Sequence, residues 1–137
     1  MAWPTRSPAA VWVLFGSLEA VQHWFVRRQL PCLVVGSCAQ GVPLPSVDAD
    51  YRAACRHAGA LLRRKGHRRI ALIRPDGDFG GDLESEQGLL EALRGDATAS
   101  LLVLRHNSTP EHLCALLEKA LRSPQPPTAC VVARTVH

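Results

Sequence analysis

A run of basic residues, Arg-Arg-Lys-Gly-His-Arg-Arg at 63–69, is the first segment of this sequence that could do chemistry. Arginine and lysine could contact the phosphates of a nucleic acid. His67 could act as a general base, if a pocket and an orienting partner were present. The run could also mark a helix end, because cations are favoured at the negative C-terminal end of a helix.

Local physical chemistry favours the structural interpretation of this run. Gly66 stands where a helix commonly ends in the left-handed conformation. Aromatic residues for base stacking are absent nearby, and the sequence provides no clear partner for His67. We therefore expect the run to close a helix and precede a strand.

The other candidate motifs are weaker. The loop Pro-Asp-Gly-Asp-Phe-Gly-Gly-Asp at 75–82 is rich in glycine, but it lacks the Lys-Ser/Thr ending of a P-loop and does not fit the dinucleotide motif. Its three aspartates would repel phosphate. The scattered cysteines form no CxxC pair, which favours small buried hydrophobic residues over a metal site or a disulfide. We expect no catalytic residue, no metal and no cofactor, and hence no enzyme; the cysteines are Cys32, Cys38, Cys55, Cys114 and Cys130.

Apolar strands alternate with amphipathic helices along the chain, which predicts parallel sheets covered on both faces. Ser17, Asp50 and a capping box of Ser108 with Glu111 are the predicted helix starts, with Pro110 in a first turn. Within the helix at 82–94 we expect three leucines to face inward: Leu83, Leu90 and Leu93. The predicted strands lie at 10–16, 32–36, 69–73, 100–105 and 128–133, with a short extended segment at 46–50, and the other helices at 17–30, 51–65 and 108–123.

Composition limits the class of protein. The chain has 137 residues, of which 47% are hydrophobic and 20% charged, as in globular domains. The net charge of +4 permits contact with nucleic acid without requiring it. No apolar run approaches the roughly 20 residues of a membrane span, and the N-terminus lacks the pattern of a signal peptide. We expect a cytoplasmic protein without a membrane partner.

The order of these segments resembles the sensor domain of the LacI/GalR family of bacterial transcription regulators. The resemblance runs over about residues 10–135, through LPCLVVGS, SVDADYRAACRHAGALLRRKGHRRIALI, SEQGLLEAL and PTACVVAR. The Gly-His-Arg-Arg-Ile core after a helix of this length is its most specific part.

The resemblance implies an α/β fold of the periplasmic-binding-protein-like type I, with parallel sheets and parts of two lobes. Residues 1–9 would form an irregular tail, 10–44 part of the N-terminal lobe, 45–50 a crossover, and 51–137 part of the C-terminal lobe. It also implies a small-molecule effector, sugar-like or another polar metabolite, bound between lobes. The full-length protein would be a homodimer that contacts DNA only through a separate domain, for which this sequence shows no helix-turn-helix.

Site residues follow from the resemblance, because ligands of open α/β sheets bind beyond the carboxyl ends of strands. Gly36 or Ser37 ends the second strand, and Val47 and Asp48 lie on the crossover. Asp48 could bind the ligand or serve as a turn or cap residue. Two further positions correspond to a pocket arginine and an asparagine in many members, and this chain has Ser85 and Arg134 there.

Alternatives remain open at this stage. The chain could be a truncated, non-functional fragment, a Rossmann-like or flavodoxin-like enzyme domain, or a transport-type binding protein. We also expect part of the apolar surface around Trp12, Trp24 and Phe25 to be uncovered, and hence self-association.

Overall fold

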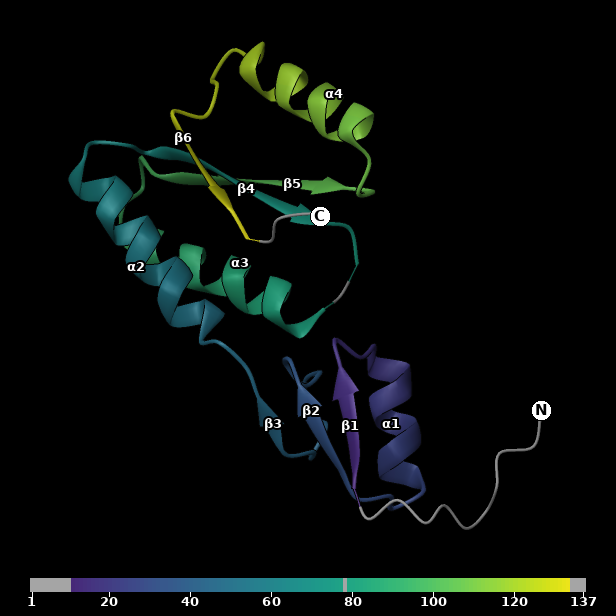
Figure 1. The fold of residues 1–137 in the computed structure, drawn as a ribbon. Helices are drawn as coiled ribbons and strands as arrows, with labels where there is room; N and C mark the ends of the chain where they lie inside the picture. Colours follow the sequence, from purple (N-terminus) through teal and green to yellow (C-terminus); the bar gives the residue numbers. More distant parts are fainter. Residues whose placement is uncertain (1–10, 78, 134–137) are drawn as a thin grey trace. The chain divides into compact units, whose positions relative to one another are not determined.

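The computed structural model describes residues 11–77 and 79–133 (Figure 1). The chain divides into two compact units, Met1–Ala49 (unit 1) and Asp50–His137 (unit 2). The boundary in the sequence falls within the expected crossover at 45–50. In chain order the described elements are β1 (Trp12–Phe15), α1 (Glu19–Arg27), β2 (Cys32–Val35), β3 (Ser46–Val47), α2 (Tyr51–Arg64), β4 (Arg69–Pro75), α3 (Gly80–Leu93), β5 (Ser100–His106), α4 (Pro110–Leu121) and β6 (Ala129–Val132). None of the helices among the described residues has the length and hydrophobicity needed to cross a bilayer.

Unit 1 is a three-stranded parallel sheet in the order β1-β2-β3, with α1 against one face (Figure 1). Because successive strand residues point to opposite faces, β2 buries Cys32 and Val34 on the helix side. Phe25 of α1 completes this core by edge-to-face contacts with Trp12 and Trp24, at centroid separations of 5.9 and 5.1 Å.

The opposite face of the unit 1 sheet is apolar and exposed. Val13 is 50% exposed and Phe15 is 75% exposed, and the register places Phe15, Val35 and Val47 side by side across the strands. Uncovered apolar surface was expected around Trp12, Trp24 and Phe25. The exposed side chains are instead those that alternate with Trp12 in β1, because α1 covers the face that carries the aromatic cluster.

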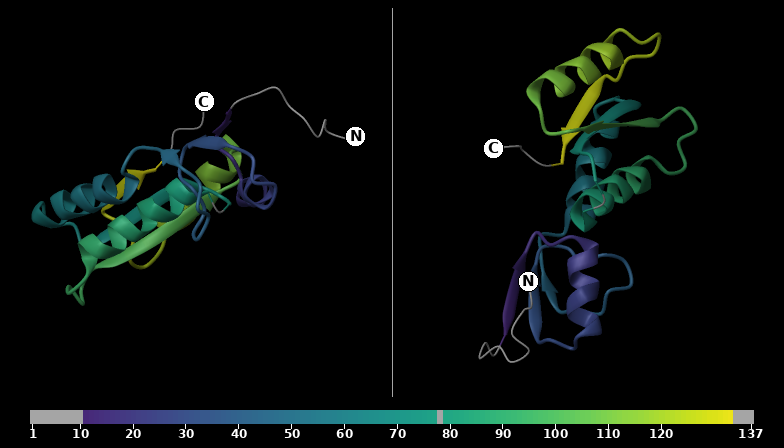
Figure 2. Two further views of the ribbon diagram at one scale, coloured as in Figure 1. Left: turned by 90° about the horizontal axis from the view of Figure 1, so that it is seen from below. Right: turned by 90° about the vertical axis from the view of Figure 1, so that its right-hand side faces the viewer.

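Unit 2 is a three-stranded parallel sheet in the order β5-β4-β6, with β4 in the centre. Helix α4 covers one face, where Ala71 and Ile73 pack against Leu104 and Ala120. Helices α2 and α3 lie on the other face, where Leu72 packs against Cys55 and Leu89 (Figure 2). With both faces and both edges covered, β4 is buried from Ile70 to Pro75.

Two glycines allow α2 and α3 to pack closely. A Cβ atom on Gly88 would lie 2.2 Å from the Arg52 carbonyl oxygen, and one on Gly59 would lie 2.7 Å from the Ala92 Cβ atom. The contact is flanked by an ion pair of the Arg52 guanidinium with Glu91. This pair raises the pKa of Arg52 and lowers that of Glu91, chiefly through its side-chain hydrogen bond.

Several predicted helix signals are confirmed. Asp50 caps α2 by accepting a hydrogen bond from the Ala53 amide at 2.8 Å. Gly66 has φ +92°, the left-handed conformation expected just after α2. Pro110 occupies the first position of α4.

Two other predicted caps are wrong. Leu18 is the N-cap residue of α1, and the Ser17 hydroxyl accepts a hydrogen bond from the side-chain Nε2 of Gln22 instead of capping the helix. Thr109 caps α4 by accepting from the His112 amide, so no capping box of Ser108 with Glu111 forms. Ser108 has φ +66°, a turn that shifts the helix start by one residue.

The predicted inward face of α3 is also partly wrong. Leu93 is buried, but Leu83 and Leu90 are 40% and 44% exposed. The buried stripe follows Ser85, Gly88, Leu89 and Ala92, because small residues are needed where α2 lies close. The leucine pattern therefore pointed to a neighbouring face of the helix.

Candidate ligand-binding site

The carboxyl ends of β2 and β3 bring together the residues predicted in unit 1. The Gly36 amide donates to the Val47 carbonyl at 2.9 Å. Just beyond the strands, the Ser37 hydroxyl donates to Asp48 Oδ2 at 2.5 Å. Gly36, Ser37, Val47 and Asp48 thus form one polar edge.

Glycine is required at the turn after β2. Gly36 has φ +129°, a conformation that residues with a side chain rarely adopt. An added Cβ atom would also contact the backbone of Gly16, 3.6 Å from its nitrogen, at the end of β1. The turn therefore holds the chain ends of β1 and β2 close together.

Gln22 ties this edge to α1. Its amide nitrogen donates to the carbonyl oxygens of Ser17 and Ser37 at 3.1 and 3.2 Å, and its oxygen accepts from the Ala39 amide at 2.7 Å. The side chain is only 1% exposed, so these bonds satisfy a buried amide. The sequence analysis did not identify Gln22. The available signal was its position three residues before Phe25, which places a polar side chain on the apolar face of the helix.

Asp48 is exposed and uses both carboxylate oxygens within its own turn. Oδ2 accepts from Ser37 and Oδ1 accepts from the Ala49 amide at 2.8 Å. The turn role of Asp48 is therefore observed, at a position that is exposed. A carboxylate beside a hydroxyl can accept hydrogen bonds from the hydroxyl or amine groups of a polar ligand.

Unit 2 has a second polar edge at the carboxyl ends of its strands, which the sequence analysis did not predict. Arg74 is fully buried at the end of β4 and pairs with Glu86 of α3, with Nε 3.2 Å from Oε2. Its Nη1 donates to the carbonyls of Pro75 and Gly77 at 3.2 and 2.8 Å. Arg105 of β5 lies 3.5 Å from the same Glu86 oxygen. An arginine at the end of an apolar strand was the available signal.

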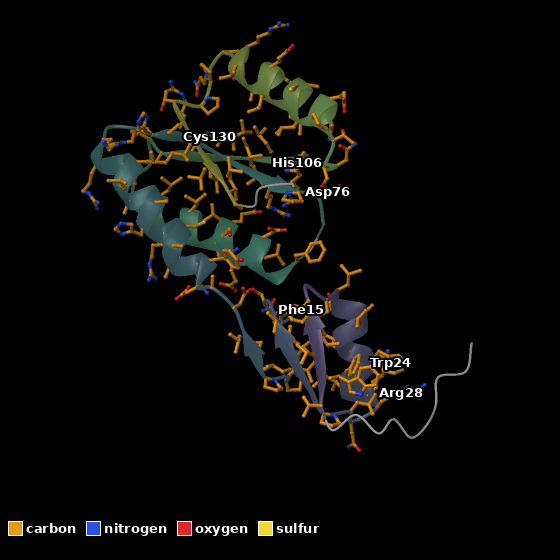
Figure 3. The ribbon with its side chains drawn as sticks, in the orientation of Figure 1. Phe15, Trp24, Arg28, Asp76, His106 and Cys130 are labelled. Carbon is orange, nitrogen blue, oxygen red and sulfur yellow. The ribbon has the colours of Figure 1, made fainter. Side chains whose placement is uncertain are left out.

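Asp76 and His106 lie side by side at this edge (Figure 3). The Asp76 amide donates to the His106 carbonyl at 2.7 Å, and the Ser108 amide donates to His106 Nδ1 at 3.1 Å. His106 is 2% exposed, whereas Asp76 is exposed. The histidine ring therefore orders the β5–α4 turn, and the Asp76 carboxylate faces solvent.

Of the two remaining predicted residues, the structure describes Ser85 alone. Ser85 is 1% exposed and its hydroxyl donates to the Gly81 carbonyl at 2.8 Å, so it is engaged within α3. Arg134 lies outside the described residues. Their ligand-binding roles stay predictions.

No cluster of three or more metal-binding side chains occurs within the described ranges. All five cysteines are free thiols; Cys32 and Cys55 are buried as expected, but Cys114 and Cys130 are exposed. Burial raises the pKa of the Cys32 thiol, which favours the neutral form.

No protein-family model matches this chain. The HTH-type transcriptional regulator AglR of Rhizobium meliloti (strain 1021) is 35% identical over 94 residues, which are 67% of this chain and 26% of AglR. A LacI transcriptional regulator from a Rhodococcus species is 29% identical, with a TM-score of 0.72 over 92% of this chain and 47% of that structure.

The Cra transcriptional dual regulator of Pseudomonas putida, solved in complex with fructose 1-phosphate, is 24% identical, with a TM-score of 0.69 over 88% of this chain and 47% of its own. The chain thus spans about a quarter of its curated relative and less than half of these solved structures. The likeness confirms the predicted fold class, a partial α/β domain with parallel sheets.

Proposed function

We propose that this chain senses a small polar effector. The proposal starts from its relation to the LacI/GalR family of transcription regulators and from its fold, which is that of part of their ligand-binding domain. The observation that supports this proposal is the polar edge at the carboxyl ends of β2 and β3. There the Ser37 hydroxyl and the Asp48 carboxylate lie 2.5 Å apart at an exposed position.

The chemistry of this edge suits a hydroxyl-bearing ligand. Asp48 can accept hydrogen bonds, whereas the Ser37 hydroxyl can both donate and accept. The bonds of Gln22 and the turn at Gly36 fix the backbone that carries both groups, which lowers the entropic cost of binding. The proposed effector is a sugar-like compound or another polar metabolite, consistent with the sugar phosphate in the Cra structure.

The proposed mechanism is a shift of conformational equilibrium. An effector that binds one conformation more tightly increases its population by that difference in affinity. In this proposal a DNA-binding domain responds to the shift, as the name of the HTH-type relative suggests, and the regulator acts as a homodimer in the cytoplasm. The similar proteins described above are regulators rather than enzymes, which favours binding over catalysis.

The test is a thermal-shift screen of sugars, sugar phosphates and polar metabolites on the 137-residue chain, followed by calorimetry. For a compound that binds, we expect Asp48→Asn and Ser37→Ala each to weaken affinity about tenfold, the effect of losing one hydrogen bond to a charged group. Ser46→Ala is the matched control, because Ser46 is exposed on β3 and its side chain makes no hydrogen bond among the described residues. Equal affinity of all three variants would refute the assigned site.

A further inference from the structure

Helix α2 ends and β4 begins at the amino-terminal end of the unit 2 sheet (Figure 1). An open groove lies at this place. We call it the basic groove; it measures about 310 Å³ and is lined by Ala60, Arg63, Arg64 and Arg68. Its volume lies at the lower end of the range typical of small-molecule sites. Its arginines belong to the basic run that sequence reasoning interpreted as a helix end.

The charges in the basic groove do not cancel. Asp96 is the acidic partner, with Oδ2 3.0 Å from Arg68 Nε and 3.8 Å from Arg63 Nη2. Hydrogen bonds from Thr98 hold the pKa of Asp96 below its usual value, so the carboxylate is charged at neutral pH. Three guanidinium groups and one carboxylate leave an excess of two positive charges.

Two of the arginines are held in place by backbone carbonyls. Arg63 Nη1 donates to the Ala92 carbonyl, and Arg68 Nη1 donates to the carbonyls of Arg63 and His67 at 2.9 and 3.2 Å. These contacts are the helix-end role expected of basic residues. They also fix the two side chains before any ligand arrives.

The helix-end role does not account for every donor. Arg63 Nε is buried and has no hydrogen-bond acceptor within the described ranges. Arg64 is exposed and makes no hydrogen bond or ion pair in the part of the chain that the structure describes. The described residues therefore supply no acceptor to the Arg63 Nε donor or to the Arg64 guanidinium.

We propose that the basic groove binds a phosphate-type oxyanion, either free phosphate or the phosphate group of a small metabolite. The planar fork of a guanidinium matches two oxygens of such an anion, and Arg64 is free to close on it. The basic groove is formed by residues of unit 2, whereas the edge proposed to bind the effector is formed by residues of unit 1. It therefore does not depend on the proposed effector function.

A duplex nucleic acid fits the basic groove less well. Specific and non-specific DNA binding relies on many phosphate contacts spread along the duplex. Here three arginines surround one small groove that also contains the Asp96 carboxylate. This geometry favours a single compact anion.

The experiment titrates the 137-residue chain by calorimetry with two phosphate probes, inorganic phosphate and glycerol 3-phosphate, at constant ionic strength set with chloride. A short DNA duplex is titrated in the same buffer for comparison. We expect saturable binding of at least one probe, with Arg64→Gln weakening it about fivefold. Asp96→Asn keeps an acceptor for Thr98, removes the competing charge, and should tighten binding about threefold. Arg122→Gln is the control, because Arg122 is an exposed arginine at the end of α4, away from the groove.

Circular dichroism checks that each variant is folded. If Asp96→Asn is unfolded, Arg64→Lys serves as the second test of the site. Lysine keeps the positive charge but lacks the planar guanidinium, so the affinity for phosphate should lie between that of the parent and that of Arg64→Gln. Selective binding of free phosphate identifies the free anion, and selective binding of the ester identifies a metabolite. The proposal is overturned if neither probe binds beyond chloride, if Arg122→Gln weakens binding as much as Arg64→Gln, or if only duplex DNA binds.

Discussion

Replacing Gly88 by alanine tests the close packing of α2 and α3 directly. The new Cβ atom would lie 2.2 Å from the Arg52 carbonyl oxygen and 3.0 Å from both the Arg52 carbonyl carbon and the Arg56 nitrogen. Ordinary contact begins at 3.4 Å, so the helices must separate by about 1 Å. All three atoms are backbone, which means that no side-chain rotation relieves the overlap.

Two opposing effects set the size of the change. Alanine is favoured over glycine inside a helix by about 1 kcal/mol. Overpacking costs about 1–3 kcal/mol and more where backbone must move, and separating the helices also weakens the contacts of Leu89 with Cys55 and Leu72. We expect a net loss of about 2–3 kcal/mol in the free energy of unfolding of unit 2.

Urea denaturation followed by circular dichroism measures this loss, and two other glycines calibrate it. Gly59→Ala meets only side chains, including the Ala92 Cβ atom at 2.7 Å, and should cost less. Gly66→Ala meets nothing within 4 Å and costs only the strain of φ +92°, about 1 kcal/mol. If Gly88→Ala proved as stable as the parent, or more stable than Gly66→Ala, the inferred packing of α2 on α3 would be wrong.

Three further perturbations have defined outcomes. Asp50→Ala removes the cap of α2 and should lower the stability of unit 2 by about 1 kcal/mol in chemical denaturation, whereas Asp50→Asn should retain most of it. Glu91 has a folded-state pKa below its usual 4.5, so its ion pair stabilises the protein above pH 4.5 and loses this effect as the pH falls through the lower folded value. Glu91→Gln should therefore flatten the acid limb of the stability–pH curve, and an unchanged slope would contradict the assignment. Phe15→Lys on the exposed sheet face of unit 1 should reduce self-association in concentration-dependent light scattering, and a parent chain that stays monomeric at high concentration would contradict the expectation.

The order of elements could be predicted because it depends on local periodicity. The apolar runs of β2, β4 and β6 and the stripes of the helices are visible within short windows of sequence. Asp50, Gly66 and Pro110 act on adjacent backbone groups, so their roles could also be inferred. The cap at Thr109 was missed because Ser, Thr and Pro stand together and the choice depends on a turn at Ser108.

The site was only partly predictable, for a related reason. Ser37 and Asp48 could be placed at strand ends, because parallel strands bring their carboxyl ends to one edge. Gln22 and Arg74 could not, since each also bonds to partners 12 to 17 positions away in sequence, which are chosen by packing. The buried stripe of α3 was misassigned because glycine and serine carry no hydrophobic signal where two helices touch.

The central position of β4 has a consequence for synthesis of the chain. Both of its pairing partners, β5 and β6, follow it in sequence, the first beginning at Ser100 and the second at Ala129. A strand that is apolar on both faces is therefore synthesised before either of its pairing partners. At about 5–20 residues per second, β6 follows the end of β4 by several seconds. During that interval the apolar segment Ile70–Ile73 lacks part of the sheet that buries it in the folded chain, and the length of the interval is set by the rate of translation.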